Sequence, residues 1–243
     1  MRPYVFGHRG ASGYEVENTI LAFEKAVSFG AGIESDIRMT RDNKLICFHD
    51  PQFKVRKKKY HVNKLAYEEI KLVIFENGRE IPLLEDVFQI FSNCSENLRY
   101  SLDIANLQVG LEVIGLAKKF SILKRIEITD RRLSVLLKLR NENNQIRLIY
   151  TLAEIIKTLT NEYSSINKLK NIDALAINIR YGRKIEDLFK EIIDHGFKCY
   201  IWGVNFKTSM KEVLELEHKD ETVSAIYTDY PDILLDMISE HFK

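Results

Sequence analysis

Hydrophobic residues recur along the chain with two spacings that alternate. Short apolar runs of strand length, such as residues 4–6, are followed by stretches with helical spacing, such as Ile20, Phe23 and Val27. About eight strand-then-helix units follow one another in this way. The alternation belongs to the α/β class, and it favours a closed (β/α)8 TIM barrel over an open sheet.

The second strand is expected to reverse in a hairpin. Two β-rich pieces, residues 32–39 and 44–50, flank a polar stretch centred near Asp42. Counting outwards from that centre places Asp36 opposite about residue 48 and Glu34 opposite about residue 50.

A short insertion after this third strand segment interrupts the alternation. Residues 51–82 contain a charge run over 54–59 and then a helical piece around 67–73. We interpret 51–82 as a small flap on a single domain that spans residues 1–243. A basic flap could attract anionic substrates or lipid surfaces, although most charge runs are merely solvated.

Composition narrows the class of protein. The 243 residues are 45% hydrophobic, enough for a sizeable core, and Lys+Arg 36 against Asp+Glu 35 leaves a net charge of +1. That balance gives no electrostatic case for binding nucleic acid. Cys47, Cys94 and Cys199 form no CxxC pair, and no apolar run approaches a membrane span of about 20 residues. We therefore expect a soluble, cytoplasmic protein without stable membrane insertion.

Candidate chemistry is concentrated between His8 and Asp50. Glu34 and Asp36 are two residues apart in an apolar run, and a strand projects such a pair on one face. Crowded carboxylates are costly unless they are neutralised, so the pair suggests a divalent cation; the alternative is two surface carboxylates on an edge strand. His8 and the nearby His49 would make an acid and base pair.

Polar and aromatic residues from distant segments fall at or just after the ends of predicted strands. These residues are His8, Glu34, Asp36, Asp103, Trp202 and Asn205. Because active residues of such barrels come from the C-terminal ends of the strands, they predict one active site.

The ordered motifs resemble those of the glycerophosphodiester phosphodiesterase family. They are HRG (8–10), ENT (17–19), IESD (33–36), HDP (49–51), IPLLEDV (81–87), WGVN (202–205) and TDYPD (228–232). The resemblance implies a metal-dependent barrel that hydrolyses small-molecule glycerophosphodiesters to an alcohol and sn-glycerol 3-phosphate. It also implies that Glu34, Asp36 and Asp103 hold the metal.

Two positions depart from the family pattern. The family usually has Glu where this chain has Asp103, and Lys where it has Ala105. The second change removes a cation that would face the phosphate, and Arg180 at another strand end is a candidate substitute.

Both lines of reasoning predict hydrolysis at one Mg²⁺ or Ca²⁺, since all-oxygen ligation suits these ions. Arg9 would bind the phosphate, with His8 as base and His49 as acid. Glu17 would either hydrogen-bond at the site or support the start of the helix, and we favour a supporting role outside the ligand sphere. Trp202 is either a core aromatic or a wall for the glycerol or alcohol group.

Two other functions remain open from the sequence. One is lysophospholipase D or sphingomyelinase D-like chemistry on lipid head groups, which a membrane-binding flap would favour. The other is a degenerate barrel that binds phosphodiesters without turnover, for which Ala105 is the sequence support. The preferred head group and the oligomeric state are not predicted.

Overall fold

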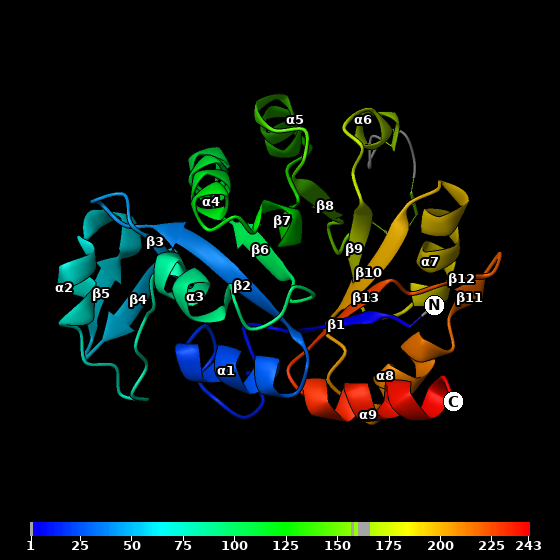
Figure 1. Ribbon diagram of the computed structural model, residues 1–243, viewed down its shortest axis with the longest axis horizontal. Coiled ribbons are helices and arrows are strands. Elements are labelled where there is room, and N and C mark those ends of the chain that lie inside the picture. The colour runs from blue at the N-terminus through cyan, green and yellow to red at the C-terminus, as the bar shows by residue number, and fades with distance from the viewer. Residues whose placement is uncertain (1, 157, 160–165) are drawn as a thin grey trace.

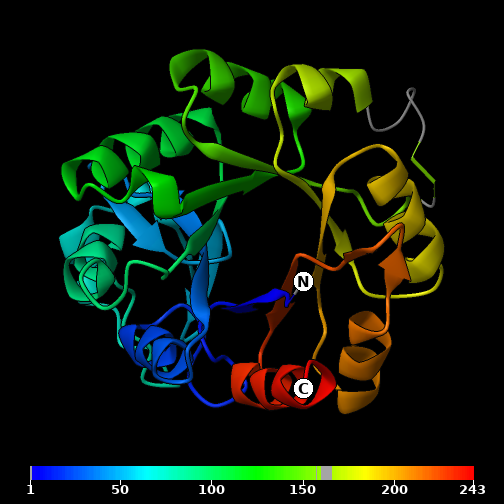
Figure 2. The same cartoon turned by 45° about the vertical axis from the view of Figure 1, so that its right-hand side comes forward.

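A closed barrel of parallel strands forms the centre of the protein (Figure 2). The structure is a computed structural model that describes residues 2–156, 158–159 and 166–243. In this part of the chain, eight strands pair in the order β1-β13-β10-β9-β8-β7-β6-β2, and β2 pairs back to β1. The strands are β1 (Tyr4–Gly7), β2 (Gly32–Met39), β6 (Tyr100–Ile104), β7 (Ile126–Asp130), β8 (Arg147–Thr151), β9 (Ala176–Arg180), β10 (Lys198–Trp202) and β13 (Ala225–Thr228). The predicted (β/α)8 barrel is confirmed.

Closure between β1 and β2 depends on a glycine. The register pairs Phe6 with Gly32, so the first residue of β2 lies against the rings of β1. A Cβ at Gly32 would lie 2.6 Å from the ring of Tyr4 and 2.8 Å from the carbonyl oxygen of Arg99. Only a residue without a side chain fits where the barrel closes.

Helices surround the barrel (Figures 1 and 2). Thr19 caps the start of the first of them, because its side chain accepts a hydrogen bond from the Ala22 amide. The sequence also predicts an amphipathic stretch that begins at Ala153, and part of this stretch lies outside the described residues. The helices around the barrel are α1 (Ile20–Ser28), α3 (Leu84–Phe91), α4 (Leu107–Lys119), α5 (Leu133–Glu142), α6 (Ile166–Asn171), α7 (Ile185–Asp194), α8 (Lys207–Leu214) and α9 (Pro231–His241).

The predicted hairpin is present between β2 and the antiparallel strand β3 (Leu45–Cys47). Ile37 pairs with Cys47, and the Phe48 amide donates to the Asp36 carbonyl at 2.8 Å, as the count about Asp42 required. The ladder stops there, so the expected pairing of Glu34 with residue 50 is not part of it.

The insertion after β3 contains a second hairpin, β4 (Gln52–Val55) and β5 (Lys58–His61). The sequence predicted only a charge run here, because lysines on the outer face hide the alternation of the inward-facing side chains. A 3-10 turn (Val62–Lys64) and the expected helix α2 (Tyr67–Lys71) follow. The insertion packs its own hydrophobic cluster, which includes Phe48, Phe53, Val62, Ile70 and Ile81.

A small antiparallel pair, β11 (Glu217–His218) and β12 (Glu221–Thr222), precedes β13 and was not predicted. No helix in the described ranges has the length and apolar character needed to cross a membrane.

Candidate active site

A cavity of about 150 Å³ lies where the strand ends meet. Seven of the nine predicted site residues line it. Of the other two, Glu17 contacts Arg9, and Asn205 donates a hydrogen bond to Asp229, the partner of His8. The lining residues are His8, Arg9, Glu34, Asp36, His49, Ser101, Asp103, Thr129, Thr151, Asn178, Trp202 and Tyr227.

Three carboxylates enter the cavity from two adjacent strands. Glu34 and Asp36 are separated by one residue on β2, so their side chains share a face. Asp103 on β6 is the register partner of Asp36. The spacing on β2 and the pairing with β6 together bring all three to one wall of the cavity.

The carboxylates are poorly solvated and repel one another. Burial raises the pKa of Glu34 to about 7, with a further increase from Asp36 and a decrease from the charge of His8. Asp103 is exposed to the open cavity but surrounded by protein. This partial desolvation, followed by the charges of Asp36 and Glu34, raises its pKa to about 8. The wall therefore favours the binding of protons or of a cation.

The donor set fits a hard divalent cation by its chemistry, because all three side chains offer only oxygen. As the side chains stand, no three His, Cys, Asp or Glu residues in the described ranges are gathered around one point. Arg9 lies against the carboxylates instead. Its amide donates to Glu34 Oε2 at 2.7 Å, and its Nε is 3.1 Å from Asp36 Oδ2. To bind an ion, these side chains would have to change their positions, but no further protein ligand would be needed.

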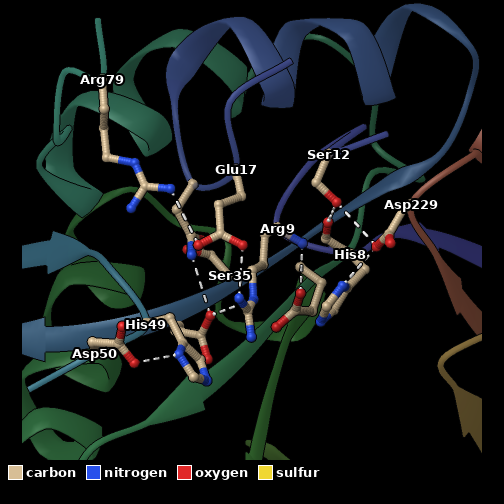
Figure 3. A network of polar contacts seen from close by, with 12 residues as sticks. His8, Arg9, Ser12, Glu17, Ser35, His49, Asp50, Arg79 and Asp229 are labelled. Atoms are coloured by element: carbon tan, nitrogen blue, oxygen red, sulfur yellow. Dashed lines mark hydrogen bonds and ion pairs between the residues drawn. The ribbon is translucent and has the colours of Figure 1, made fainter. Parts of the chain in front are cut away.

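His8 is held by a carboxylate from the opposite end of the chain (Figure 3). Its Nδ1 is 2.8 Å from Asp229 Oδ1, and Asp229 also accepts hydrogen bonds from Ser12 and Asn205. Burial alone would lower the pKa of His8, but the bond to Asp229 and the charge of Glu34 outweigh it, so the pKa is raised. With Nδ1 donating to Asp229, Nε2 is left to exchange a proton in the cavity.

His49 follows β3 and approaches the same cavity from the hairpin. Its Nδ1 is 2.8 Å from Asp50 Oδ1, and both side chains are exposed. The His49 carbonyl accepts hydrogen bonds from the guanidinium of Arg38. The second imidazole thus has a carboxylate partner like the first, but a more solvated one.

A chain of charges connects the insertion to Arg9 (Figure 3). Arg9 Nη1 is 2.7 Å from Glu17 Oε2, and Arg79 Nη2 is 3.1 Å from Glu17 Oε1. Arg79 comes from the insertion and lies over the ring of Phe48, 5.3 Å from its centroid. Glu17 therefore braces the Arg9 guanidinium and is itself held by the insertion.

A wider chamber of about 450 Å³ adjoins the cavity and shares Asp36, His49, Asp103, Thr151 and Trp202 with it. Ala105 lines the chamber, as do three arginines: Arg38, Arg131 and Arg132.

Arg180, the candidate substitute for the missing lysine, lines a neighbouring hollow instead. It pairs with Glu154 at 2.6 Å and lies over the Trp202 ring, 5.2 Å from its centroid. Arg38 is better placed, because it continues the i, i+2, i+4 series of Glu34 and Asp36 along β2.

Four residues that the structure places around the site were not predicted from the sequence to belong to it. Arg38 was signalled by the same period-two spacing as the carboxylates. Asp229 was signalled by its place just after the last strand, which neighbours β1 in a closed barrel. Asn18, whose side chain donates to Asp36 at 3.2 Å, lies in a quoted motif. Arg79 had no signal, because it lies in irregular backbone between α2 and α3.

The fold and the cavity define a class of protein. It is a barrel enzyme with two histidines, an arginine and a wall of carboxylates at the C-terminal ends of its strands. The model of the Glycerophosphoryl diester phosphodiesterase family matches residues 8–233. The chain belongs to this family and is a phosphoric diester hydrolase.

Proteins similar to this chain over most of their length carry the names of phosphodiester-cleaving enzymes. The glycerophosphodiester phosphodiesterase of Caldanaerobacter subterraneus is 26% identical over 98% of this chain and 98% of its own length. Lysophospholipase D GDPD1 of Homo sapiens is 26% identical over 95% of this chain and 84% of its own length. An Oleispira antarctica phosphodiesterase, solved with the product sn-glycerol-3-phosphate, shares the fold with a TM-score of 0.79 at 17% identity, over 98% and 97% of the two chains.

Proposed function

We propose that the protein hydrolyses glycerophosphodiesters to an alcohol and sn-glycerol 3-phosphate. One observation carries the proposal: His8, Arg9, His49 and the three carboxylates line a single cavity at the strand ends. Phosphodiester hydrolysis needs a base, an acid and positive charge at the phosphate, and this set supplies each. The product complex of the Oleispira antarctica phosphodiesterase supports the same product for this chain.

Glu34, Asp36 and Asp103 would hold one Mg²⁺ or Ca²⁺. When bound, the ion supplies charge stabilisation at a phosphoryl oxygen and lowers the pKa of an oxygen nucleophile. The raised pKa values of Glu34 and Asp103 support this assignment, because burial and mutual repulsion disfavour the charged carboxylates and a bound cation would offset both effects.

Arg9 would bind the phosphate through its guanidinium. In the structure this group is held between Glu17 and Asp36. Burial alone would lower the pKa of Arg9, but the two carboxylates outweigh that effect, so the pKa is raised. A substrate phosphate would compete for the same donors, so Arg9 can exchange one anion for another without losing its position.

His8 would be the base and His49 the acid. The bond to Asp229 orients His8, and its Nε2 can then accept a proton from the attacking oxygen. His49 lines both the cavity and the chamber beside it, so it lies where the alcohol would leave. Trp202 also lines both spaces and would form a wall for the glycerol or alcohol group.

A second candidate function is lysophospholipase D activity on lipid head groups. The name of the Homo sapiens relative supports it, as does the 450 Å³ chamber, which leaves space beside the phosphate site for a larger substituent. The same residues would perform the reaction, so the two functions differ in substrate and not in mechanism.

Product analysis tests the proposal. Purified protein is incubated with glycerophosphocholine, glycerophosphoethanolamine or lysophosphatidylcholine, each with Mg²⁺, Ca²⁺ or EDTA. We expect cation-dependent release of sn-glycerol 3-phosphate from the first two. Lysophosphatidic acid from the third, without glycerol 3-phosphate from the others, would favour lysophospholipase D. No hydrolysis of any substrate would indicate a barrel that binds phosphodiesters without turnover.

A further inference from the structure

The β4–β5 hairpin of the insertion carries five cations that have no ion-pair partner among the described residues. They are Lys54, Arg56, Lys57, Lys58 and Lys59, and all five are exposed. Arg56 and Lys57 form the tip, with φ values of 47° and 68°. The hairpin is therefore a concentrated positive surface that the protein itself does not neutralise.

Two of these cations oppose each other across the hairpin. Lys54 is the register partner of Lys59, while the neighbouring pair, Phe53 and Tyr60, stacks on the other face with ring centroids 5.3 Å apart. Like charges placed directly opposite destabilise a ladder. The aromatic face holds the hairpin together, and an external anion would relieve the repulsion on the lysine face.

Exposed aliphatic side chains belong to the same insertion. In the segment after α2, Val73 and Phe75 pack on the insertion's hydrophobic cluster, and Phe75 lies 5.1 Å from the ring of Phe53. The residues that alternate with them, Leu72 and Ile74, point outwards and are 82% and 78% exposed. The packing of Phe75 on β4 keeps this apolar pair on the same small unit as the cationic hairpin.

We propose that the insertion docks on an anionic lipid surface. Lysines attract acidic head groups, and protruding aliphatic side chains enter the boundary between head groups and acyl chains. A nucleic acid would match the charge but would leave Leu72 and Ile74 in water, so the apolar pair favours lipid.

Docking would also place the proposed active site close to the lipid. The insertion follows β3, which pairs with the C-terminal half of β2, and it lies beside that end of the strand (Figure 1). The residues that line the cavity come from the same end of the barrel. Arg79 of the insertion forms an ion pair with Glu17 beside that cavity. The docking itself needs neither turnover nor a bound cation.

Co-sedimentation with vesicles tests the proposal. The full chain is mixed with vesicles of phosphatidylcholine alone or of phosphatidylcholine with phosphatidylglycerol, at low and high salt. We expect binding only to the anionic vesicles, weakened by salt. The variants Lys54→Glu/Lys59→Glu and Leu72→Ser/Ile74→Ser should each bind the anionic vesicles at least about tenfold more weakly than the wild type. A matched control, Lys118→Glu/Lys124→Glu, reverses two exposed charges at the opposite end of the barrel and should bind like the wild type.

Thermal melting and hydrolysis of soluble glycerophosphoethanolamine should be unchanged in every variant, which shows that the fold is intact. The proposal is overturned if wild type ignores anionic vesicles, if it binds neutral ones equally, or if the hairpin variant binds like wild type. Tighter binding to single-stranded RNA that is insensitive to Leu72→Ser/Ile74→Ser would also overturn it. A protein that binds vesicles but hydrolyses nothing would refute the proposed function alone.

Discussion

Asp36 on β2 and Asp103 on β6 are register partners in adjacent parallel strands, and both line one cavity. With Glu34 two residues before Asp36, they form a wall whose charge Arg9 and His8 offset only in part. This pairing governs how the protein should respond to pH and to cations.

The stability of the cation-free protein should fall as pH rises. The pKa values of Glu34 and Asp103 are raised from 4.5 and 3.8 to about 7 and about 8, so the folded state holds protons that the unfolded state releases. Their contribution is fully present below about pH 4 and is lost as pH rises through about 8. Thermal melting in EDTA should show a decrease of several degrees, about 5 °C, over this range.

The variant Glu34→Gln/Asp103→Asn is the control, because it removes both titrating groups. Its melting temperature should change less over the same pH range than that of the wild type. Mg²⁺ or Ca²⁺ should raise the melting temperature of the wild type more at pH 8 than at pH 5, because protons compete with the ion. Equal cation effects at both pH values would contradict the carboxylate assignment.

Asp229→Asn should reduce turnover and change its pH profile. Without the carboxylate, His8 loses both its orientation and the charge that raises its pKa. We expect kcat to fall about 10- to 100-fold. If His8 is the base, the acidic limb of the profile should move to lower pH; if it is the acid, the basic limb should move. An unshifted profile would show that Asp229 has only a structural role.

Arg79→Ala should make the Arg9 guanidinium less firmly held, although Arg79 itself does not line the cavity. The change removes one of the two guanidinium partners of Glu17, and we expect a rise in KM of about threefold to tenfold and a loss of about 1 kcal/mol in the free energy of unfolding. Lys71→Ala is a suitable control, because Lys71 pairs with Glu68 at the exposed surface of the same insertion. Equal effects of the two substitutions on KM would refute the bracing role.

Arg38→Ala should lower kcat/KM by about tenfold or more, if this guanidinium supplies the positive charge that Ala105 does not. Ala105 lines the same chamber, so Ala105→Lys in the Arg38→Ala background should restore part of the loss. Arg180→Ala, which breaks a pair outside the cavity, should have a smaller effect. A larger loss from Arg180→Ala than from Arg38→Ala would reverse the assignment.

The sequence predicted those parts of the site that obey a local rule. Glu34 and Asp36 follow from strand spacing, and the hairpin about Asp42 follows from turn composition. Asp103 and Trp202 required the further assumption that strand ends converge. That the chain forms one domain stays a prediction.

Contacts between distant segments were harder to predict. The Asp229–His8 bond could have been inferred from closure, because β13 and β1 are neighbours and Thr228 pairs with Gly7. The place of Arg79 could not, since irregular backbone between α2 and α3 decides where its side chain goes. The β4–β5 hairpin was hidden because its stabilising aromatic face is interleaved with lysines.

The most direct test of the account is turnover in His8→Ala and His49→Ala, measured as sn-glycerol 3-phosphate released from glycerophosphoethanolamine, beside calorimetric binding of the cation. Removal of either imidazole should cost about 10²- to 10⁴-fold in rate, as expected for an acid or base, and should leave cation affinity largely intact. Wild-type rates in either variant would contradict the claim that these two histidines perform the chemistry in this cavity.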